Sequence, residues 1–582
     1  MMSKPAGRVA LALLLISGTA GAQTYDPASG ASPLTLLAVP EDGVAYYQTL
    51  ERVRALNAAG RWAEMEPLLD RMVREYPRDP ETWMMLGRAR DRLSRGAEAV
   101  AAWERAGALI GWDLQYANGY RVAVGHLNAG DRTAALAALR RMVFDRHGIW
   151  RQNVLSVFPQ LEPLKDDPEF REITGWVDTT GWTRNQGWLH DIEFAYAELK
   201  RLNPDYRHRV FPAEFERRFA ELKRNIPTLS DEEIFFGLKR TLAVLHQGHL
   251  VIWPGDDTPN RYLPVRFYAF PEGIFIIDAA PAHRDLVGSR VVTIGSLPAE
   301  EALRRLSEGN SVDGDMEYLW NTADLNSTYN LKGMGAIRAT DAVNLTVQRP
   351  GAAIRRVSLP TLAASMEGRQ DKLLAPPGVT PPLFLSDLGQ TLWERALPEH
   401  DAVYVQVNNL KADTDETLDQ FAERLWTALQ RAQPKNLILD LRHNNGGTTQ
   451  LYPDLLRTLI AYSRMPNTQV YVMIGRRTYS AAGNFVTDLE RLTKPIFVGE
   501  ASSECCNLYG DPAVVTLPYS RIQGEFTAVK WQLSTPSDRR REMSPEVPVQ
   551  LTAAAYFAGL DPALDATLRL IAERRAQSTT AR

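Results

Sequence analysis

Cysteine is nearly absent from this chain of 582 residues, which contains only Cys505 and Cys506. Two cysteines cannot form a disulfide scaffold, and alone they are too few to hold a zinc ion. Because the two are adjacent, three states remain open: a vicinal disulfide, two free thiols or an intermolecular bond.

An excess of charge of either sign is absent as well. The chain has 66 Lys and Arg against 70 Asp and Glu, a net charge of −4. Binding nucleic acid in bulk requires a basic face that neutralises phosphates, so we expect no nucleic-acid partner. Apolar residues make up 45% and charged residues 23%, which excludes a disordered or collagen-like chain. At roughly 100–200 residues per domain, the length suggests about three to five domains.

Long hydrophobic runs are missing beyond the N-terminus. There, Lys4 and Arg8 precede an apolar run, 9–16, and small residues then lead to an Ala-x-Ala site at 20–22. This is the three-part layout of a secretory signal, and the run is too short to span a bilayer, which takes about 20 helical residues. We predict a signal peptide over 1–22 and an exported, periplasmic or secreted protein without a transmembrane segment. An uncleaved N-terminal anchor is the alternative.

Turn-like glycines recur at a nearly constant interval in the first part of the chain. Gly60, Gly96 and Gly130 stand in similar settings, 36 and 34 residues apart. A period near 34 is typical of tetratricopeptide (TPR) repeats, which consist of two antiparallel helices each. We predict an all-α TPR-like region over 23–165, either a surface for a protein partner or a helical spacer. From Pro80 on, small and large packing residues follow at the TPR spacing: Trp83, Leu86, Gly87, Ala99, Trp103 and Ala106.

A second helical segment, 180–250, ends in a histidine. Apolar residues at helical spacing predict helices over 188–202, 215–222 and 230–245. The last begins with Ser230 and Glu233, the pattern of a capping box. His249 follows a glycine where this helix passes to a strand-like run, a place where a side chain is held but accessible. It can act as a base, or it can merely satisfy local hydrogen bonds.

Short apolar runs separated by turn residues characterise the next segment, 251–384. They predict small antiparallel sheets that position or cover a site. The runs are 265–270, 274–277, 290–294 and 343–347. No spacing typical of metal ligands occurs in this segment.

Strand and helix patterns alternate through 385–575, before a short tail at 576–582. The predicted strands are 402–407, 436–442, 469–474 and 495–498, and the helices are 414–431, 451–462 and 484–492. Such alternation indicates a parallel sheet with right-handed crossovers. The run 436–442 is almost continuously apolar, as in strands buried on both faces. In these sheets, ligands bind beyond the carboxyl ends of the strands.

Two features follow those carboxyl ends. Gly446 and Gly447 come directly after one strand, where glycine lets the backbone approach a ligand closely. Ser480 comes after the next strand, among small residues and just before a predicted helix. Free N–H groups at a helix start can stabilise an oxyanion, so Ser480 is a candidate nucleophile that needs a base. The alternative is that Ser480 only caps its helix.

In their order and separations, the motifs across 188–550 resemble the S41 peptidases, the family of C-terminal processing and tricorn core proteases. The motifs are the Gly-His pair after the helical segment, DLRHNNGG at 440–447, RTYSAA at 477–482, VGE at 498–500 and PEVPV at 545–549. The last is similar to a closing Pro-Asp-Ile-x-Val motif, with glutamate in place of aspartate. The resemblance implies a ClpP/crotonase-like α/β core with a β-rich accessory segment, preceded by the all-α repeats.

The resemblance also implies a catalytic arrangement. One design in the family pairs serine with a lysine 25 residues later, but that position is Cys505. The other uses a histidine base, and His249 stands where many relatives carry it in an Asp-Gly-His-Thr sequence, here Gln-Gly-His-Leu. The N–H groups of Gly447, beside Gly446, and of Ala481 would bind the oxyanion.

An acidic residue is expected to orient His249. Asp538 and Glu542 lie in the segment where relatives carry one, and the choice between them stays open. Asp538 pairing with a nearby arginine is the structural alternative.

We therefore expect an exported serine endopeptidase that cleaves protein or peptide substrates, with TPR-like repeats that recruit protein. No cofactor and no metal is expected: His246 and His249 stand at i and i+3, but no third zinc ligand is evident. Two other interpretations remain open. One is an inactive S41-like module that binds a peptide or apolar ligand, as in the similar repeats of interphotoreceptor retinoid-binding protein. The other is a scaffold in which the repeats do the work.

Overall fold

The computed structural model describes residues 43–109, 112–363, 373–412 and 416–580, so the predicted signal peptide lies outside the described residues. The chain divides into two compact units. The first contains the described residues up to Gly181 together with Ala197–Asn203 and Ala513–Pro518, and the second contains the rest. Within the described ranges, no helix has the length and apolar character needed to cross a bilayer.

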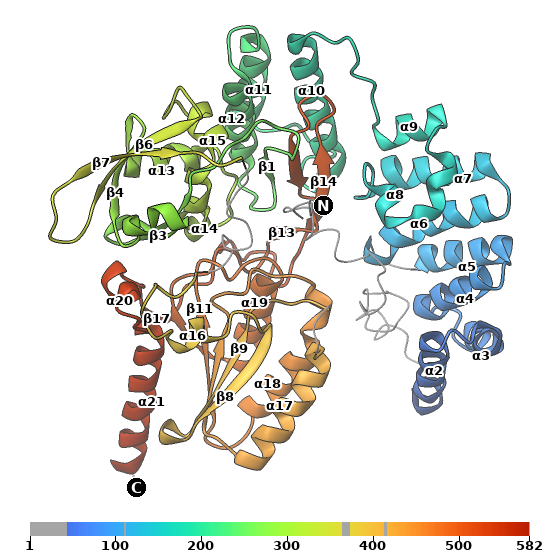
Figure 1. Cartoon of the computed structure of the whole chain (residues 1–582). Coiled ribbons are helices and arrows are strands. Elements are labelled where there is room, and N and C mark those ends of the chain that lie inside the picture. The colour runs from blue at the N-terminus through green and yellow to red at the C-terminus, as the bar shows by residue number, and fades with distance from the viewer. Residues whose placement is uncertain (1–42, 110–111, 364–372, 413–415, 581–582) are drawn as a thin grey trace. The chain divides into compact units, whose positions relative to one another are not determined.

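The first unit is built from helices that pack against their neighbours in chain order (Figure 1). The turns at Gly60 and Gly130 have φ of 67° and 81°, a conformation that glycine adopts without steric cost. Pro80 opens its helix behind Asp79, whose side chain caps it by accepting from Glu81 N–H. The helices are α2 (Gly43–Ala58), α3 (Trp62–Glu75), α4 (Pro80–Arg92), α5 (Gly96–Leu109), α6 (Trp112–Asn128), α7 (Arg132–Arg140), α8 (Val154–Val157) and α9 (Pro168–Thr174).

Small and large residues interlock between α4 and α5, as the TPR spacing predicts. A Cβ built on Gly87 would lie 2.3 Å from the Trp103 indole, so the absence of a side chain is what admits the ring. Trp103, Leu86, Ala99 and Ala106 are all buried. This contact fixes the approach of the two helices of the middle repeat.

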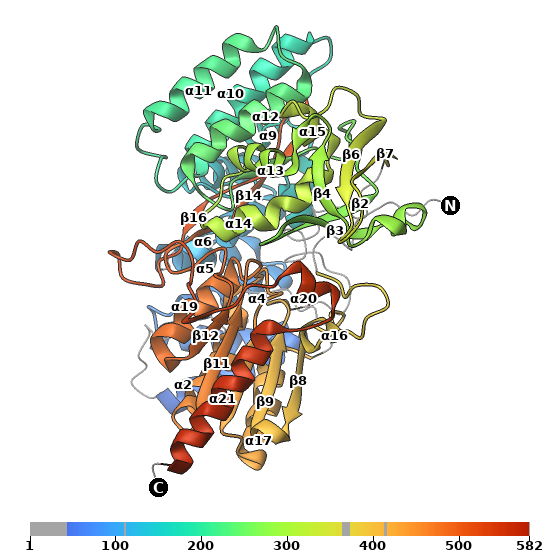
Figure 2. The ribbon, with the colours of Figure 1, turned by 90° about the vertical axis from the view of Figure 1, so that its left-hand side faces the viewer.

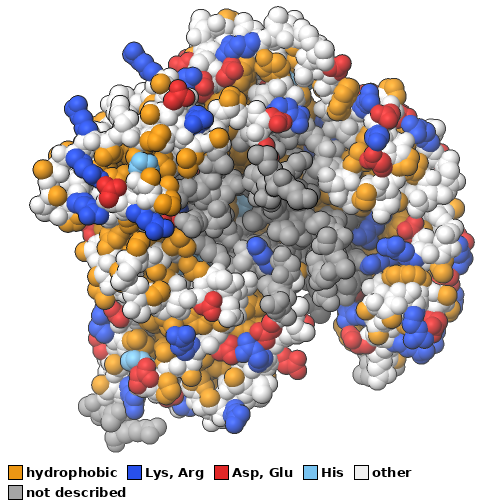
Figure 3. All heavy atoms as spheres, viewed as in Figure 1, with side chains coloured by type: hydrophobic (Ala, Val, Ile, Leu, Met, Phe, Trp, Pro, Cys, Tyr) orange, Lys and Arg blue, Asp and Glu red, His pale blue; other side chains and the backbone are white. Residues whose placement is uncertain are grey.

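The polar faces of these helices carry charges of both signs. Arg90 contacts Asp70 at 2.8 Å and Glu66 at 3.2 Å, and such pairs join neighbouring helices. On the face that Figure 3 shows, basic and acidic side chains are interspersed over the repeats. The expected lack of a nucleic-acid partner stays a prediction.

The second unit begins with three helices, α10 (Arg184–Leu202, of which residues up to Tyr196 belong here), α11 (Ala213–Asn225) and α12 (Asp231–Leu242). Ser230 and Glu233 form the predicted capping box. A short 3-10 turn ends at His246, which has a left-handed backbone, and β1 (Val251–Trp253) follows. His249 therefore stands at a helix-to-strand junction, as predicted. β1 pairs antiparallel with β15 (Gln523–Phe526).

The β-rich segment forms one antiparallel sheet in the order β2-β3-β4-β6-β7, with β5 beside β4. Four strands match the predicted runs: β2 (Val265–Phe270), β3 (Gly273–Ala279), β4 (Arg290–Ile294) and β6 (Ala342–Gln348). β5 (Leu297–Pro298) and β7 (Arg355–Pro360) were not predicted. Three helices lie within the same stretch of chain, α13 (Ala299–Glu308), α14 (Asp315–Trp320) and α15 (Thr328–Gly333).

A six-stranded sheet forms the α/β core, in the order β17-β12-β11-β10-β9-β8. All neighbouring pairs are parallel except β8 with β9. The strands are β8 (Leu392–Leu397), β9 (Ala402–Val407), β10 (Asn436–Asp440), β11 (Gln469–Ile474), β12 (Ile496–Gly499) and β17 (Val547–Pro548). The connecting helices are α17 (Leu418–Ala432), α18 (Pro453–Ser463) and α19 (Ala481–Thr493). The predicted succession of helical repeats, β-rich segment and α/β core is confirmed.

Both faces of the core sheet are covered. Leu437 and Leu439 of β10 belong to the cluster that includes α17, α18 and α19, whereas Ile438 faces the cluster that includes α21 (Pro562–Thr580). Figure 2 shows α21 lying across the strands. Burial on both sides explains why the strand is apolar without alternation.

Gly87 provides a test of the repeat packing. In an open helix, Gly→Ala is stabilising by about 1 kcal/mol. In Gly87→Ala the added methyl meets the Trp103 ring, so we expect a net destabilisation of about 1–3 kcal/mol and a lower thermal midpoint by circular dichroism. In Gly87→Ala/Trp103→Leu the loss should be smaller than the sum of the two single losses. Additive losses would show that the contact does not limit packing.

Candidate active site

The candidate nucleophile sits on an unusual backbone turn. Ser480 lies between β11 and α19 with φ 56° and ψ −124°, values that are strained for any residue with a side chain. Its side chain makes no capping hydrogen bond, so the interpretation of Ser480 as a mere helix cap is wrong. Instead the hydroxyl lies 3.0 Å from Nε2 of His249.

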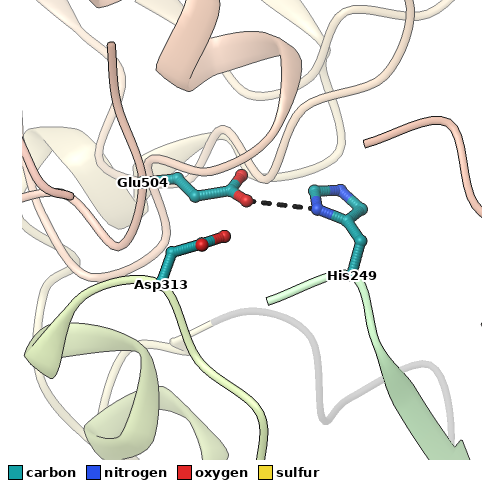
Figure 4. A group of neighbouring side chains, drawn as sticks. All are labelled: His249, Asp313 and Glu504. Carbon is teal, nitrogen blue, oxygen red and sulfur yellow. Dashed lines mark hydrogen bonds and ion pairs between the residues drawn. The ribbon is translucent and has the colours of Figure 1, made fainter. Parts of the chain in front are cut away.

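A carboxylate completes this chain of contacts. Nδ1 of His249 lies 3.1 Å from Oε1 of Glu504, and Figure 4 shows the carboxylate directed at the imidazole. The other oxygen, Oε2, accepts the backbone N–H of Ser480 at 2.7 Å. Glu504 is fully buried and His249 is 7% exposed. One carboxylate thus holds both the base and the backbone of the nucleophile.

The loop after β12 fixes Glu504 through its neighbours on both sides. Ser503 N–H donates to Thr478 O at 3.1 Å, and Cys505 N–H donates to Arg541 O at 3.1 Å. Cys506 N–H donates to Thr487 Oγ1 of α19 at 2.9 Å. The glutamate is therefore held to the same helix that Ser480 precedes.

The two cysteines after Glu504 form a vicinal disulfide, one of the three states left open by the sequence. Both are buried, and Cys506 has a φ of 73°. The ring that the bond closes restricts the Cys505–Cys506 peptide, one residue beyond Glu504.

The two acids expected to orient His249 do not contact it. Asp538 pairs with Arg540 at 2.8 Å and accepts from Ser534 Oγ at 2.7 Å, the structural alternative considered for it. Glu542 lies beside Gly314, and burial raises its pKa. Neither hydrogen-bonds to His249 among the described residues, and Glu504 occupies that place. The sequence offered one indication of it: Glu504 directly precedes position 505, where the family's other design carries its lysine.

Two further acids lie behind the base. Gly248 N–H donates to Asp313 Oδ2 at 3.0 Å, and Asp313 N–H donates to Glu317 Oε2 at 2.8 Å. Figure 4 shows the Asp313 carboxyl next to that of Glu504. Sequence reasoning missed both residues, because they come from the β-rich segment, which carried no ligand-like spacing.

Aromatic rings enclose the other side of the imidazole. The Tyr479 ring stacks on His249 with centroids 4.7 Å apart, and its hydroxyl lies 3.1 Å from Nδ1. Trp320 packs edge-on against Tyr479, and the Arg477 guanidinium lies over the Trp320 ring, 4.7 Å from its centroid. These contacts limit the movement of the base and exclude water from it.

Burial sets the ionisation of the site. Desolvation raises the pKa of Glu504 to about 8, although a hydrogen bond with Asp313 acts in the opposite direction. Desolvation also raises the pKa of Asp313 and of Glu317 well above the ordinary values. It lowers the pKa of His249, which nearby acids such as Glu525 offset only in part.

The glycine turn lies against the nucleophile. Gly446 has φ 102°, and a Cβ there would lie 2.6 Å from Ser480 Cβ. Gly447 has φ 132°, and a Cβ there would lie 2.1 Å from Leu410 O. Gly446 N–H donates to Asn444 Oδ1 at 3.0 Å. Within the described residues no acceptor is found for the N–H of Gly447 or of Ala481.

His249, Asp313 and Glu504 also have the residue types of a metal site, with ligand atoms within 4.8 Å of one another. His246, the other histidine considered for zinc, is not in this group. Because Nδ1 of His249 already contacts Glu504, a cation here would compete with the hydrogen bond that orients the base.

Comparison with known proteins identifies the class. The model of peptidase family S41 matches residues 401–469, and a tetratricopeptide repeat model matches residues 48–89. No curated protein matches the chain. The resemblance to the S41 peptidases is confirmed over the segment from β9 to the start of β11. The two matches support a serine peptidase with N-terminal TPR helices.

Solved structures of such proteases are similar to the chain at low identity. Mature CPAF complexed with lactacystin has 13% identity and a TM-score of 0.49, over 67% of this chain and 98% of that one. The photosystem II D1 C-terminal processing protease has 15% identity and a TM-score of 0.31, over 65% and 98%. The tricorn protease has 12% identity and a TM-score of 0.32, over 67% and 37%. The assignment of the class rests on the family match.

Gly446 provides a test of the turn. In Gly446→Ala the methyl group would displace Ser480, and a shift of about 1 Å in such a site can cost on the order of 100-fold in rate. We expect kcat/KM to fall by about that factor without loss of helical circular dichroism. Gly475→Ala is the matched control, because its Cβ would lie an ordinary 3.7 Å from Arg442 Cγ. Equal activities of the two variants would contradict the geometry.

Proposed function

We propose that the chain is an exported serine endopeptidase that hydrolyses peptide bonds with Ser480 as nucleophile, His249 as base and Glu504 as the orienting acid. The observation that carries the proposal is the continuous set of contacts from Ser480 Oγ through the imidazole to the Glu504 carboxylate, at 3.0 and 3.1 Å. Contacts of this length allow proton transfer between the groups.

The reaction follows from these positions. Ser480 Oγ attacks the peptide carbonyl carbon while its proton passes to His249 Nε2. Glu504 accepts from Nδ1–H and stabilises the imidazolium that forms. The N–H groups of Gly447 and Ala481 bind the oxyanion. When the tetrahedral intermediate collapses, Nε2–H protonates the leaving amine. Water then hydrolyses the acyl-enzyme by the same route and restores Ser480.

The N-terminal helices suit the recruitment of protein substrates or partners. This part of the proposal is supported by the stack of helix pairs, part of which a TPR model matches. The polar surface of these helices carries charges of both signs. Export rests on the sequence pattern of residues 1–22 alone. Both remain proposals that accompany the peptidase.

Substitution of the three residues tests the mechanism. We expect the purified protein to cleave an unfolded model protein, and Ser480→Ala to lower kcat by on the order of 10⁶-fold. Glu504→Gln should lower it by on the order of 10⁴-fold, because the amide cannot stabilise the imidazolium. Asp538→Asn is the matched control, expected to stay within a few-fold of wild type, since Asp538 only pairs with Arg540 and Ser534. Folding is verified by circular dichroism.

Two outcomes would contradict this assignment. A larger loss in Asp538→Asn than in Glu504→Gln would transfer the orienting role to Asp538. Folded wild-type protein without any activity that depends on Ser480 would favour the inactive binding module.

The activity should depend on pH through Glu504. Its pKa is raised to about 8, so below that pH the carboxyl holds a proton and cannot accept from His249 Nδ1–H. The pKa of His249 is lowered below its ordinary value of 6.5, so the base is already neutral in this range. We expect kcat/KM to rise with pH and to reach half its plateau near pH 8. A rising limb that is complete below pH 6.5 would show that Glu504 ionises normally.

A further inference from the structure

The mechanism uses only one of the three acids buried behind the base. Asp313 and Glu317 are 7% and 4% exposed, and they approach the site from the loop before α14 and from α14 itself. Burying an ionisable carboxyl without a role costs free energy, because the charged form loses its hydration. The burial of these two acids next to Glu504 therefore suggests that they have a role at the site.

The hydrogen bonds around Asp313 orient its carboxyl. Oδ2 accepts from Gly248 N–H at 3.0 Å, directly before the base in the chain. The backbone N–H of the next residue, Gly314, donates to Ser503 O at 3.2 Å, directly before Glu504. Asp313 is thus tied to both segments that carry the base and its acid.

The carboxyls of Asp313 and Glu504 lie side by side, and the ligand atoms of these two residues and His249 are within 4.8 Å of one another (Figure 4). Two ionised carboxylates have no donor and repel, so such a contact requires a proton on one of them. Glu504 already accepts with both oxygens, from His249 on Oε1 and from Ser480 N–H on Oε2. These N–H donors favour its ionised form. The proton therefore belongs on Asp313, whose carboxyl lies next to that of Glu504 (Figure 4).

We propose that Asp313 is a positioning residue that stays protonated and donates an O–H hydrogen bond to the Glu504 carboxylate. The inference rests on the proposed function. The donor does two things: it lowers the pH at which the buried Glu504 ionises, and it holds Oε1 in line with His249 Nδ1. The Asp313 carboxyl touches neither substrate nor the reacting atoms and acts only through Glu504.

The raised pKa of Asp313 agrees with this state, because burial and the hydrogen bond with Glu504 both favour its proton. Several other titratable groups face the pair from the surrounding elements: Glu317, His249, Tyr479, Tyr509, Asp511, Glu525 and Arg541. Of these, Glu317 is itself pushed toward its neutral form by burial and by Asp313. Removal of the proton from Asp313 at alkaline pH would place two anions side by side and displace Glu504.

Asparagine and leucine at this position separate the proposal from a packing role. In Asp313→Asn the amide oxygen can accept from Gly248 N–H, and the NH₂ group can donate to Glu504 without a titratable proton. In Asp313→Leu the branched shape of the side chain is kept but the donor is lost. Asp315→Asn is the matched control, because Asp315 is exposed two residues further along the chain, at the start of α14.

The pH profile of kcat/KM is the decisive measurement. Asp313→Asn should keep the plateau within a few-fold of wild type, and it should lose the fall in activity at alkaline pH. Asp313→Leu should lose about 10- to 100-fold, the effect of one hydrogen bond to a buried charge. Its rising limb should move to higher pH, since Glu504 loses its donor. Asp315→Asn should match wild type in both limbs.

Two results would overturn the proposal. One is an equal loss of kcat/KM in Asp313→Asn and Asp313→Leu with an unchanged shape of the pH profile, which is what a packing role alone would give. The other is an Asp313→Leu variant that keeps the full kcat/KM of wild type. An infrared difference spectrum of wild type against Asp313→Asn at a pH above 8, where Glu504 is ionised, gives a readout that needs no activity: we expect a protonated carboxyl band that the variant lacks. Absence of that band overturns the proposal even if the wild type is inactive, and an inactive wild type with the band overturns only the peptidase assignment.

Discussion

The carboxylate of Glu504 is the element on which the candidate site depends. It is fully buried, and it joins the imidazole of His249 to the backbone N–H of Ser480. A buried carboxylate is costly unless donors surround it. The same donors that offset this cost therefore place the base against the nucleophile. The hydrogen bonds that stabilise the charge of Glu504 are thus the same ones that align His249 with Ser480.

The fold brings these residues together at the edge where parallel strands end. β10 leads into the glycine turn and β11 into Ser480, while β12 leads into the loop of Glu504. Directly after β10, Arg442 contacts Asp440 at 2.6 Å and Asp561 at 2.8 Å. These ion pairs connect the end of β10 to the segment before α21. The base arrives from outside the sheet, at the junction between α12 and β1. The arrangement agrees with the rule that open α/β sheets bind ligands beyond the carboxyl ends of their strands.

Periodicity and turn residues were sufficient to predict four strands of each of the two six-stranded sheets, but they missed elements such as β7, β8 and α21. The strands 402–407 and 469–474 coincide with β9 and β11, and the capping box at Ser230 is present as expected. These features are local, because side-chain spacing and capping are determined within a few residues. The junction at His249 and the turn at Gly446 followed from the same reasoning combined with the family resemblance.

The acid and its supports could not be predicted in the same way. Glu504 and Asp313 meet because two loops, 191 residues apart in the sequence, fold against each other. Loop conformation is set by hydrogen bonds such as Gly314 N–H to Ser503 O, which leave no periodic pattern. Asp538 had the position expected from relatives, but its neighbour Arg540 neutralises it locally. An acid pairs with the cation within reach before it can orient a distant histidine.

The most direct test of the account is labelling of the purified protein with a fluorophosphonate, followed by mass spectrometry of the labelled peptide. The account predicts a single adduct on Ser480, formed faster as the pH rises through about 8 and slowed strongly in Glu504→Gln. Folded protein that never labels, or that labels equally fast in His249→Ala, would contradict it.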